Sequence, residues 1–176
     1  FDYLVTEVEG GTLKIYPKSI KKGFNNNSYD LRPTVYKIKS NSKELKELNT
    51  VGSGSFIISK RTKVNRMEIN MAGSGNVELR GPVKGYKLEC NMAGSGNIIA
   101  KDIQLDNLSC SLASSGEIEV IGTVDRASFN VAGSGEIKAF DCQARKAECN
   151  IASSGEISVY ATQILDANIV GSGEIP

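Results

Sequence analysis

Asparagine residues recur at fixed spacing and are the first candidates for binding chemistry. The chain repeats a Gly-Ser-Gly or Ser-Ser-Gly segment seven times, ending on Gly54, Gly75, Gly96, Gly116, Gly135, Gly155 and Gly173. Five residues before this last glycine, the copies carry Asn49, Asn70, Asn91, Ser111, Asn130, Asn150 and Asn168. Amides stacked at strand spacing can hydrogen-bond one another along the column. The asparagines therefore predict a flat polar face that is solvated, self-associating or able to bind a glycan.

Two acidic columns accompany the asparagines. Seven residues before the last glycine, the copies carry Glu47, Glu68, Glu89, Ser109, Ser128, Glu148 and Asp166. Directly after it come Asn76, Asn97, Glu117, Glu136, Glu156 and Glu174. Like charges about 5 Å apart repel one another and need screening. Water and salt suffice at an exposed turn. A bound Ca²⁺ is the alternative, because carboxylate and amide oxygens suit it, although no compact Asp-rich calcium loop is present.

These columns define the candidate surface-binding residues. They are Asn70, Asn91, Asn130, Asn150, Asn168, Glu117, Glu136 and Glu156. The expected partners are a second copy of the chain or a cell-surface glycan, and we expect no cofactor and no metal. The chain holds 21 Lys and Arg against 20 Asp and Glu, a balance that predicts no general attraction to nucleic acid.

Catalytic chemistry has little support in the residue types. Histidine is absent, so the commonest general base and metal ligand is missing. One carboxylate pair, Asp102 and Asp141, is predicted to share a column two coils apart, about 9.6 Å by strand spacing. Gly122 and Gly81 would occupy the positions between and beside them. We therefore expect a protein that is not an enzyme, with a pectinase-like polysaccharide-active enzyme as the alternative.

The four cysteines predict packing more than chemistry. Cys90, Cys110 and Cys149 share an inward-facing column, while Cys142 falls in a linker. Cys90 and Cys110 would be stacked neighbours, so a disulfide between them is an alternative to free thiols in the core. Buried thiols that act as small apolar groups are the favoured interpretation. No Cys-x-x-Cys pair is present, so no zinc site is expected.

The charge is unevenly distributed along the chain. Residues 1–66 hold 13 Lys and Arg against 6 Asp and Glu, whereas residues 67–176 hold 8 against 14. In a linear array this predicts a basic end and an acidic end, and contact of the basic end with an anionic envelope surface would be salt-dependent. No apolar run approaches 18 residues, so no membrane span is expected. The chain starts at Phe1 and its first Met is Met67, which we interpret as removal of any targeting segment.

The elements that must position these columns are short strands. Before each turn, apolar residues stand eight, six and four positions from the last glycine, as in Leu108, Cys110 and Leu112, and alternate with polar ones. A second alternation follows the turn. Strand, turn and strand repeating every 18 to 21 residues predict a right-handed, single-stranded parallel β-helix. A leucine-rich repeat is the alternative. The last glycine is invariant in the copies, and we expect positive φ there.

The first 45 residues differ from the array and are expected to form a strand-rich lead-in or cap over its first layer. Residues 3–8 and 12–16 flank Glu9-Gly10-Gly11 and predict a hairpin. Residues 32–39 predict a further strand, with Pro33 at its start. The expected division is therefore 1–45 for the lead-in, continuous with the array, and 46–176 for the β-helix of seven Gly-Ser-Gly repeats.

The repeated motif resembles a known family. Asn91 to Ile98, with the variants Ala113 to Ile118 and Val170 to Ile175, is similar to the GIN-domain family of bacterial envelope proteins, described as auto-transporter adhesin heads and frequent in Bacteroidetes. The resemblance covers roughly residues 5–176. It implies a right-handed β-helix, export through a signal peptide that is often of the lipoprotein type, and a periplasmic or surface location. It implies no catalytic residues. The favoured function is a non-enzymatic envelope adhesin or surface-binding scaffold, with a ligand-free homo-oligomeric module as a further alternative.

Overall fold

The structure, a computed structural model, describes residues 4–17 and 45–176. The chain divides into two units, Phe1–Ser40 and Asn41–Pro176. In the first, β1 (Leu4–Glu9) and β2 (Thr12–Pro17) pair antiparallel across Gly10 and Gly11, which both have positive φ, as a tight hairpin turn requires. This confirms the predicted hairpin. The predicted strand at 32–39 lies outside the described residues, and the capping role of the lead-in stays a prediction.

The second unit is a β-solenoid of parallel strands. They are β3 (Glu47–Gly52), β4 (Ser55–Ile58), β5 (Thr62–Gly73), β6 (Asn76–Leu79), β7 (Val83–Gly94), β8 (Asn97–Leu112), β9 (Glu117–Val131), β10 (Glu136–Ser153) and β11 (Glu156–Gly171). The front strands follow the order β3-β5-β7-β8-β9-β10-β11, and β4, β6 and the start of β8 pair behind them. No helix occurs in the described ranges 4–17 and 45–176.

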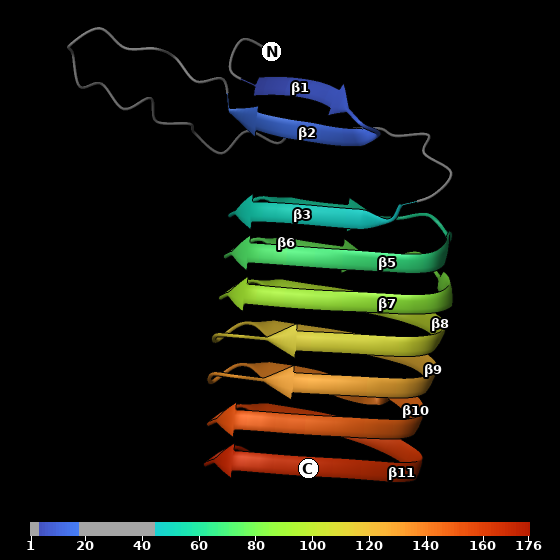
Figure 1. Cartoon of the computed structure of the whole chain (residues 1–176), viewed down its shortest axis with the longest axis vertical. Helices are drawn as coiled ribbons and strands as arrows, with labels where there is room; N and C mark the ends of the chain where they lie inside the picture. The colour runs from blue at the N-terminus through green and yellow to red at the C-terminus, as the bar shows by residue number, and fades with distance from the viewer. Residues whose placement is uncertain (1–3, 18–44) are drawn as a thin grey trace, which may run out of the picture. The chain divides into compact units, whose positions relative to one another are not determined.

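Figure 1 shows how the coils advance. The front strands run leftward to the Gly-Ser-Gly turns, the chain returns behind them, and each circuit ends one level lower, which makes the coil right-handed. From β8 onward, one long strand continues from the back around the far bend onto the front. The predicted parallel β-helix is confirmed, and residues about twenty apart lie over one another.

The core is the set of inward-facing columns predicted from the alternation. Met67, Ile69, Ile98, Ile118 and Phe129 are fully buried, and no polar or charged residue is buried among the described residues. Most residues of the same columns are solvent-exposed in β11, because this strand has a neighbouring coil on one side only. Burying these apolar columns between coils is the main favourable contribution to folding.

The last position of each Gly-Ser-Gly turn requires glycine for a different reason from the one expected. We refer to the stacked last glycines as the glycine ladder. Positive φ falls mostly on the first glycine of the turn, such as Gly73 and Gly94, and the last glycine lies outside that region. A Cβ on Gly96 would stand 2.1 Å from the backbone oxygen of Gly75 in the preceding coil. The last position therefore requires glycine because successive turns pack backbone on backbone, and the expectation of positive φ was wrong.

The cysteines are all buried with free thiols. Cys90 and Cys110 are paired in register on adjacent strands, as predicted. Cys142 corrects the sequence interpretation, because it belongs to β10 and is fully buried, opposite Gly122, whereas a linker position was expected.

Candidate binding surface

The asparagine column forms the predicted ladder on the front of the solenoid. All seven positions are in register, from Asn49 to Asn168. Asn70 donates from Nδ2 to Oδ1 of Asn49 at 2.9 Å, and Asn91 donates to Asn70 at 2.9 Å. Asn150 donates to Asn130 at 3.1 Å. The amides thus link coils in two segments, on either side of Ser111.

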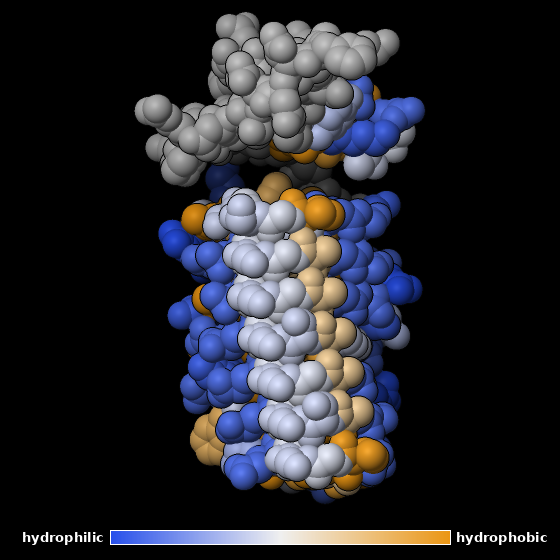
Figure 2. Space-filling model, turned by 90° about the vertical axis from the view of Figure 1, so that its left-hand side faces the viewer, coloured by the Kyte–Doolittle hydropathy of each residue, from blue (hydrophilic) through white to orange (hydrophobic). Residues whose placement is uncertain are grey.

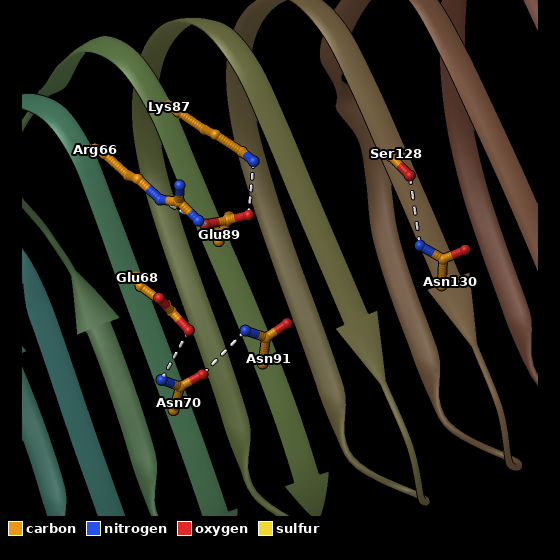
Figure 3. A network of polar contacts seen from close by, with 8 residues as sticks. All are labelled: Arg66, Glu68, Asn70, Lys87, Glu89, Asn91, Ser128 and Asn130. Carbon is orange, nitrogen blue, oxygen red and sulfur yellow. Dashed lines mark hydrogen bonds and ion pairs between the residues drawn. The ribbon is translucent and has the colours of Figure 1, made fainter.

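The asparagine donors are also tied to the acidic column beside them. Asn70 Nδ2 makes a second hydrogen bond to Glu68 at 3.1 Å, and Asn150 Nδ2 makes one to Glu148 at 3.2 Å. Asn130 donates to Ser128 Oγ at 3.4 Å, as Figure 3 shows. Because an amide nitrogen has two protons, Asn70 and Asn150 have no donor left for a ligand. Their oxygens retain acceptor capacity.

A basic column lies beyond the acidic one, and the sequence analysis missed it. Arg66, Lys87, Asn107, Arg126 and Lys146 are in register, nine residues before the last glycine of their copies. The carboxylate of Glu89 forms ion pairs with Arg66 Nη2, at 2.7 Å, and with Lys87 Nζ, at 2.6 Å (Figure 3). Lys87, with Arg66, lowers the pKa of Glu89 below its ordinary value. The two cations thus neutralise Glu89 within the front face.

An exposed apolar column completes the front face on the other side of the asparagines. Three residues before the last glycine, the copies carry Val51, Ala72, Ala93, Ala113, Ala132, Ala152 and Val170, all exposed. Figure 2 shows this column as a continuous pale-orange band beside the near-white column of turns. Mainly blue, hydrophilic surface lies on either side of these two columns. The unbroken series of small apolar residues at an outward position was the available sequence signal.

A shallow groove of about 760 Å³ runs along the solenoid between these two columns. The asparagines and Ser111 form one side and the apolar column the other, while Met71, Met92 and Leu112 are among the buried residues beneath. It extends from the coil of Asn49 to that of Asn168, six coil steps or about 29 Å. The lining contains no charged and no aromatic residue.

The structure separates the predicted site residues into two sets. Asn70, Asn91, Asn130, Asn150 and Asn168 all line the groove. Glu117, Glu136 and Glu156 follow the turn, form their own in-register column and do not line it. The eight residues therefore do not make one surface.

The glutamate column after the turn is partly neutralised by a lysine. Lys138 Nζ lies 2.8 Å from Glu117 and 3.5 Å from Glu136, and hydrogen bonding to Glu117 raises the pKa of Lys138. Upstream, the column consists of amides, with Asn97 donating to Asn76 at 3.1 Å. Within 4–17 and 45–176, no three His, Cys, Asp or Glu side chains gather as metal ligands. Lys138 supplies the screening that the sequence requires between Glu117 and Glu136.

The carboxylate pair weighed for catalysis lies elsewhere. Asp102 and Asp141 are exposed, and neither lines the groove. Each lies within a strand register shift, Asp102 between Ala100 and Ile103 and Asp141 between Lys138 and Cys142. As a result, Gly122 pairs with Ile103 and Cys142. Gly122 is thus one position out of the column in which it was expected between the two aspartates.

Comparisons with known proteins support the fold and identify the family. The family model described as "Putative auto-transporter adhesin, head GIN domain" matches residues 1–81 and 68–176. A solved structure from Parabacteroides distasonis named "Putative lipid binding protein" is 87% identical, with a TM-score of 0.89 over 99% of this chain and 78% of its own. Another from that organism, named "putative adhesin", is 22% identical, with a TM-score of 0.82 and the same coverage, and supports the fold alone. Curated proteins give no match.

The family description points to a surface or envelope protein, and the names of the two solved structures concern adhesion and lipid binding. None of the described residues forms a helix long and apolar enough to cross a membrane. Since the two matched regions together span residues 1–176, the chain belongs to the head GIN-domain family.

Proposed function

We propose that this chain is a non-enzymatic binding protein of the cell envelope, exported to the periplasm or cell surface, which holds an elongated, mainly aliphatic ligand along its groove. The groove itself carries the proposal. Its volume of about 760 Å³ is in the range of small-molecule sites, and it crosses every coil from Asn49 to Asn168. A long shallow site on a rigid solenoid suits a chain-like ligand lying parallel to the axis.

The lining favours an aliphatic chain. Apolar side chains form one side and the floor, and the amide donors of Asn70 and Asn150 are already used within the protein. Burying aliphatic carbon against such a surface contributes up to about 0.8 kcal/mol per CH₂ group. The name of the 87% identical relative is consistent with a lipid ligand.

Glycan adhesion is the second candidate and is favoured by the asparagine oxygens, which can accept hydrogen bonds from sugar hydroxyls. Sugar sites usually also offer an aromatic platform, and the groove lining has none. Self-association through the groove alone is less well supported. A strip about 29 Å long and about 7 Å wide, two residues of strand, covers roughly 200 Å². Stable interfaces need about 800 Å² per partner.

The experiment compares a fluorescent fatty acid with a glycan array on wild type, Ala113→Lys and Thr123→Lys. Ala113 lies midway along the groove, whereas Thr123 is exposed and outside it. We expect fatty-acid binding that Ala113→Lys weakens at least tenfold and Thr123→Lys leaves unchanged. If the protein binds only glycans, and Ala113→Lys weakens that binding, the second candidate, glycan adhesion, would be favoured. Absence of binding to both probes, or equal effects of the two substitutions, would overturn the groove as the site.

A further inference from the structure

The first coils carry a cluster of cations on the solenoid edge opposite the Gly-Ser-Gly turns. Lys60 and Arg61 lie in the connection from β4 to β5, and Lys63 and Lys84 are in register on β5 and β7. All four are exposed. We refer to these four residues as the basic edge. In-register cations on neighbouring strands, about 4.8 Å apart, repel each other.

The basic edge has no neutralising carboxylate among the described residues. Lys60, Arg61 and Lys63 make no side-chain ion pair there, and Lys84 Nζ bonds only to the neutral amide oxygen of Gln104, at 2.7 Å. By contrast, the nearby Arg66 is neutralised by an ion pair with Glu89. The positive charge of this edge is therefore available to an external anion.

Charge changes sign along the solenoid axis. Residues 45–90 contain eight Lys and Arg and four Asp and Glu, whereas residues 91–176 contain five and eleven. The coils stack in chain order, so the excess charge runs from positive to negative along the stack. On the same edge, the Lys63 and Lys84 column continues as Gln104 and Thr123, with Asp106 and Asp125 beside them.

We propose that the basic edge docks the first coils onto an anionic lipid surface through its phosphate headgroups. A membrane that contacts this edge at the first coils leaves the acidic later coils outside the contact. A linear polyanion following the edge would instead meet Asp106 and Asp125. Tyr86, beside Lys84 and 54% exposed, is a residue type typical of membrane–water interfaces. The contact is independent of the groove and would orient the solenoid at the membrane.

The test measures sedimentation of the full chain with phosphatidylcholine vesicles, with and without phosphatidylglycerol. We expect binding only to the phosphatidylglycerol vesicles, decreasing as salt is raised. Each cation near an anionic surface strengthens binding about fivefold, so the triple variant K60Q/R61Q/K63Q is expected to bind about a hundredfold more weakly. The single variant Lys63→Gln should weaken binding about fivefold, and it checks that the triple effect is not a loss of folding.

The control variant K101Q/R126Q/K146Q removes the same number of charges from later coils and should bind within twofold of wild type. Equal losses in the two triple variants would show that only net charge matters and would overturn the proposal. Binding to pure phosphatidylcholine, or absence of binding at low salt, would do the same. A DNA duplex that competes fully with the vesicles would identify a general polyanion site and exclude the lipid assignment.

Discussion

Asn91 donates a hydrogen bond from Nδ2 to Oδ1 of Asn70, 2.9 Å away on the preceding coil. The same contact joins Asn70 to Asn49 and Asn150 to Asn130. The ladder is interrupted at Ser111, which makes no side-chain hydrogen bond among the described residues. Stacked amides at strand spacing therefore connect the coils in two separate segments.

Restoring the missing amide should join the two segments. The new amide would contact both Asn91 and Asn130. We therefore expect Ser111→Asn to stabilise the fold by about 1–2 kcal/mol, at about 1 kcal/mol net for each hydrogen bond. Urea unfolding measures this, with Thr123→Asn on the opposite edge as the control and no change expected there. A lower unfolding midpoint for Ser111→Asn would mean that this position does not accommodate the ladder.

The glycine ladder predicts a sharp contrast between two equivalent positions. In Gly96→Ala the new Cβ would stand 2.1 Å from the Gly75 oxygen, whereas in Gly54→Ala it would meet nothing within 4 Å. We expect Gly96→Ala to lower the free energy of unfolding by about 3 kcal/mol and Gly54→Ala by less than about 0.5 kcal/mol. Urea unfolding measures both values. Similar losses of unfolding free energy in the two variants would mean that glycine is required for the local turn conformation and not for packing between coils.

The cysteine column predicts unreactive thiols. Burial raises the pKa of Cys142 to about 12 and that of Cys149 to about 11, and the neighbouring Cys90, together with burial, raises the pKa of Cys110. In a thiol titration at pH 8, we expect no reaction in the folded protein and all four cysteines to react in denaturant without reductant. A count of two after unfolding would indicate a disulfide between Cys90 and Cys110.

The ion pairs of Glu89 predict a defined pH dependence. Because Lys87 and Arg66 lower its folded pKa below the ordinary 4.5, the pairs stabilise the fold above that pH. This contribution disappears as the pH falls through the folded pKa. In Glu89→Gln the difference in urea midpoint between pH 7 and pH 3 should become smaller. Glu156→Gln, which removes a carboxylate that makes no ion pair among the described residues, should leave that difference unchanged. An unchanged difference in Glu89→Gln would show that the pairs are too solvated to matter.

The period of the sequence was enough to predict the coils and the register of the front strands. Counting from the last glycine works there because successive turns stack directly on one another. The count fails beyond the far bend, where the register shifts between Ala100 and Ile103 and between Lys138 and Cys142. These shifts account for the errors at Cys142 and Gly122, since bends of different length move later residues between columns.

The groove was not predicted because it depends on the relation between two columns. The sequence identifies Asn91 as outward and polar, but it does not show that exposed Ala93 and buried Met92 complete one apolar channel with it. It also grouped Glu117 with the asparagines, although the turn places that carboxylate outside the groove. Periodicity gives the direction of a side chain, whereas a site also requires the positions of the columns around the turn.

The central claim is that one elongated ligand lies along the groove across the coils. Its most direct test is the dissociation constant of a fluorescent fatty acid for wild type, Ala72→Lys, Ala113→Lys and Ala152→Lys. Ala72 and Ala152 are four coils apart, about 19 Å. We predict that each substitution alone weakens binding at least tenfold, because each places a charged side chain on the same ligand. Sensitivity at only one of the three positions, or at none, would contradict an elongated site.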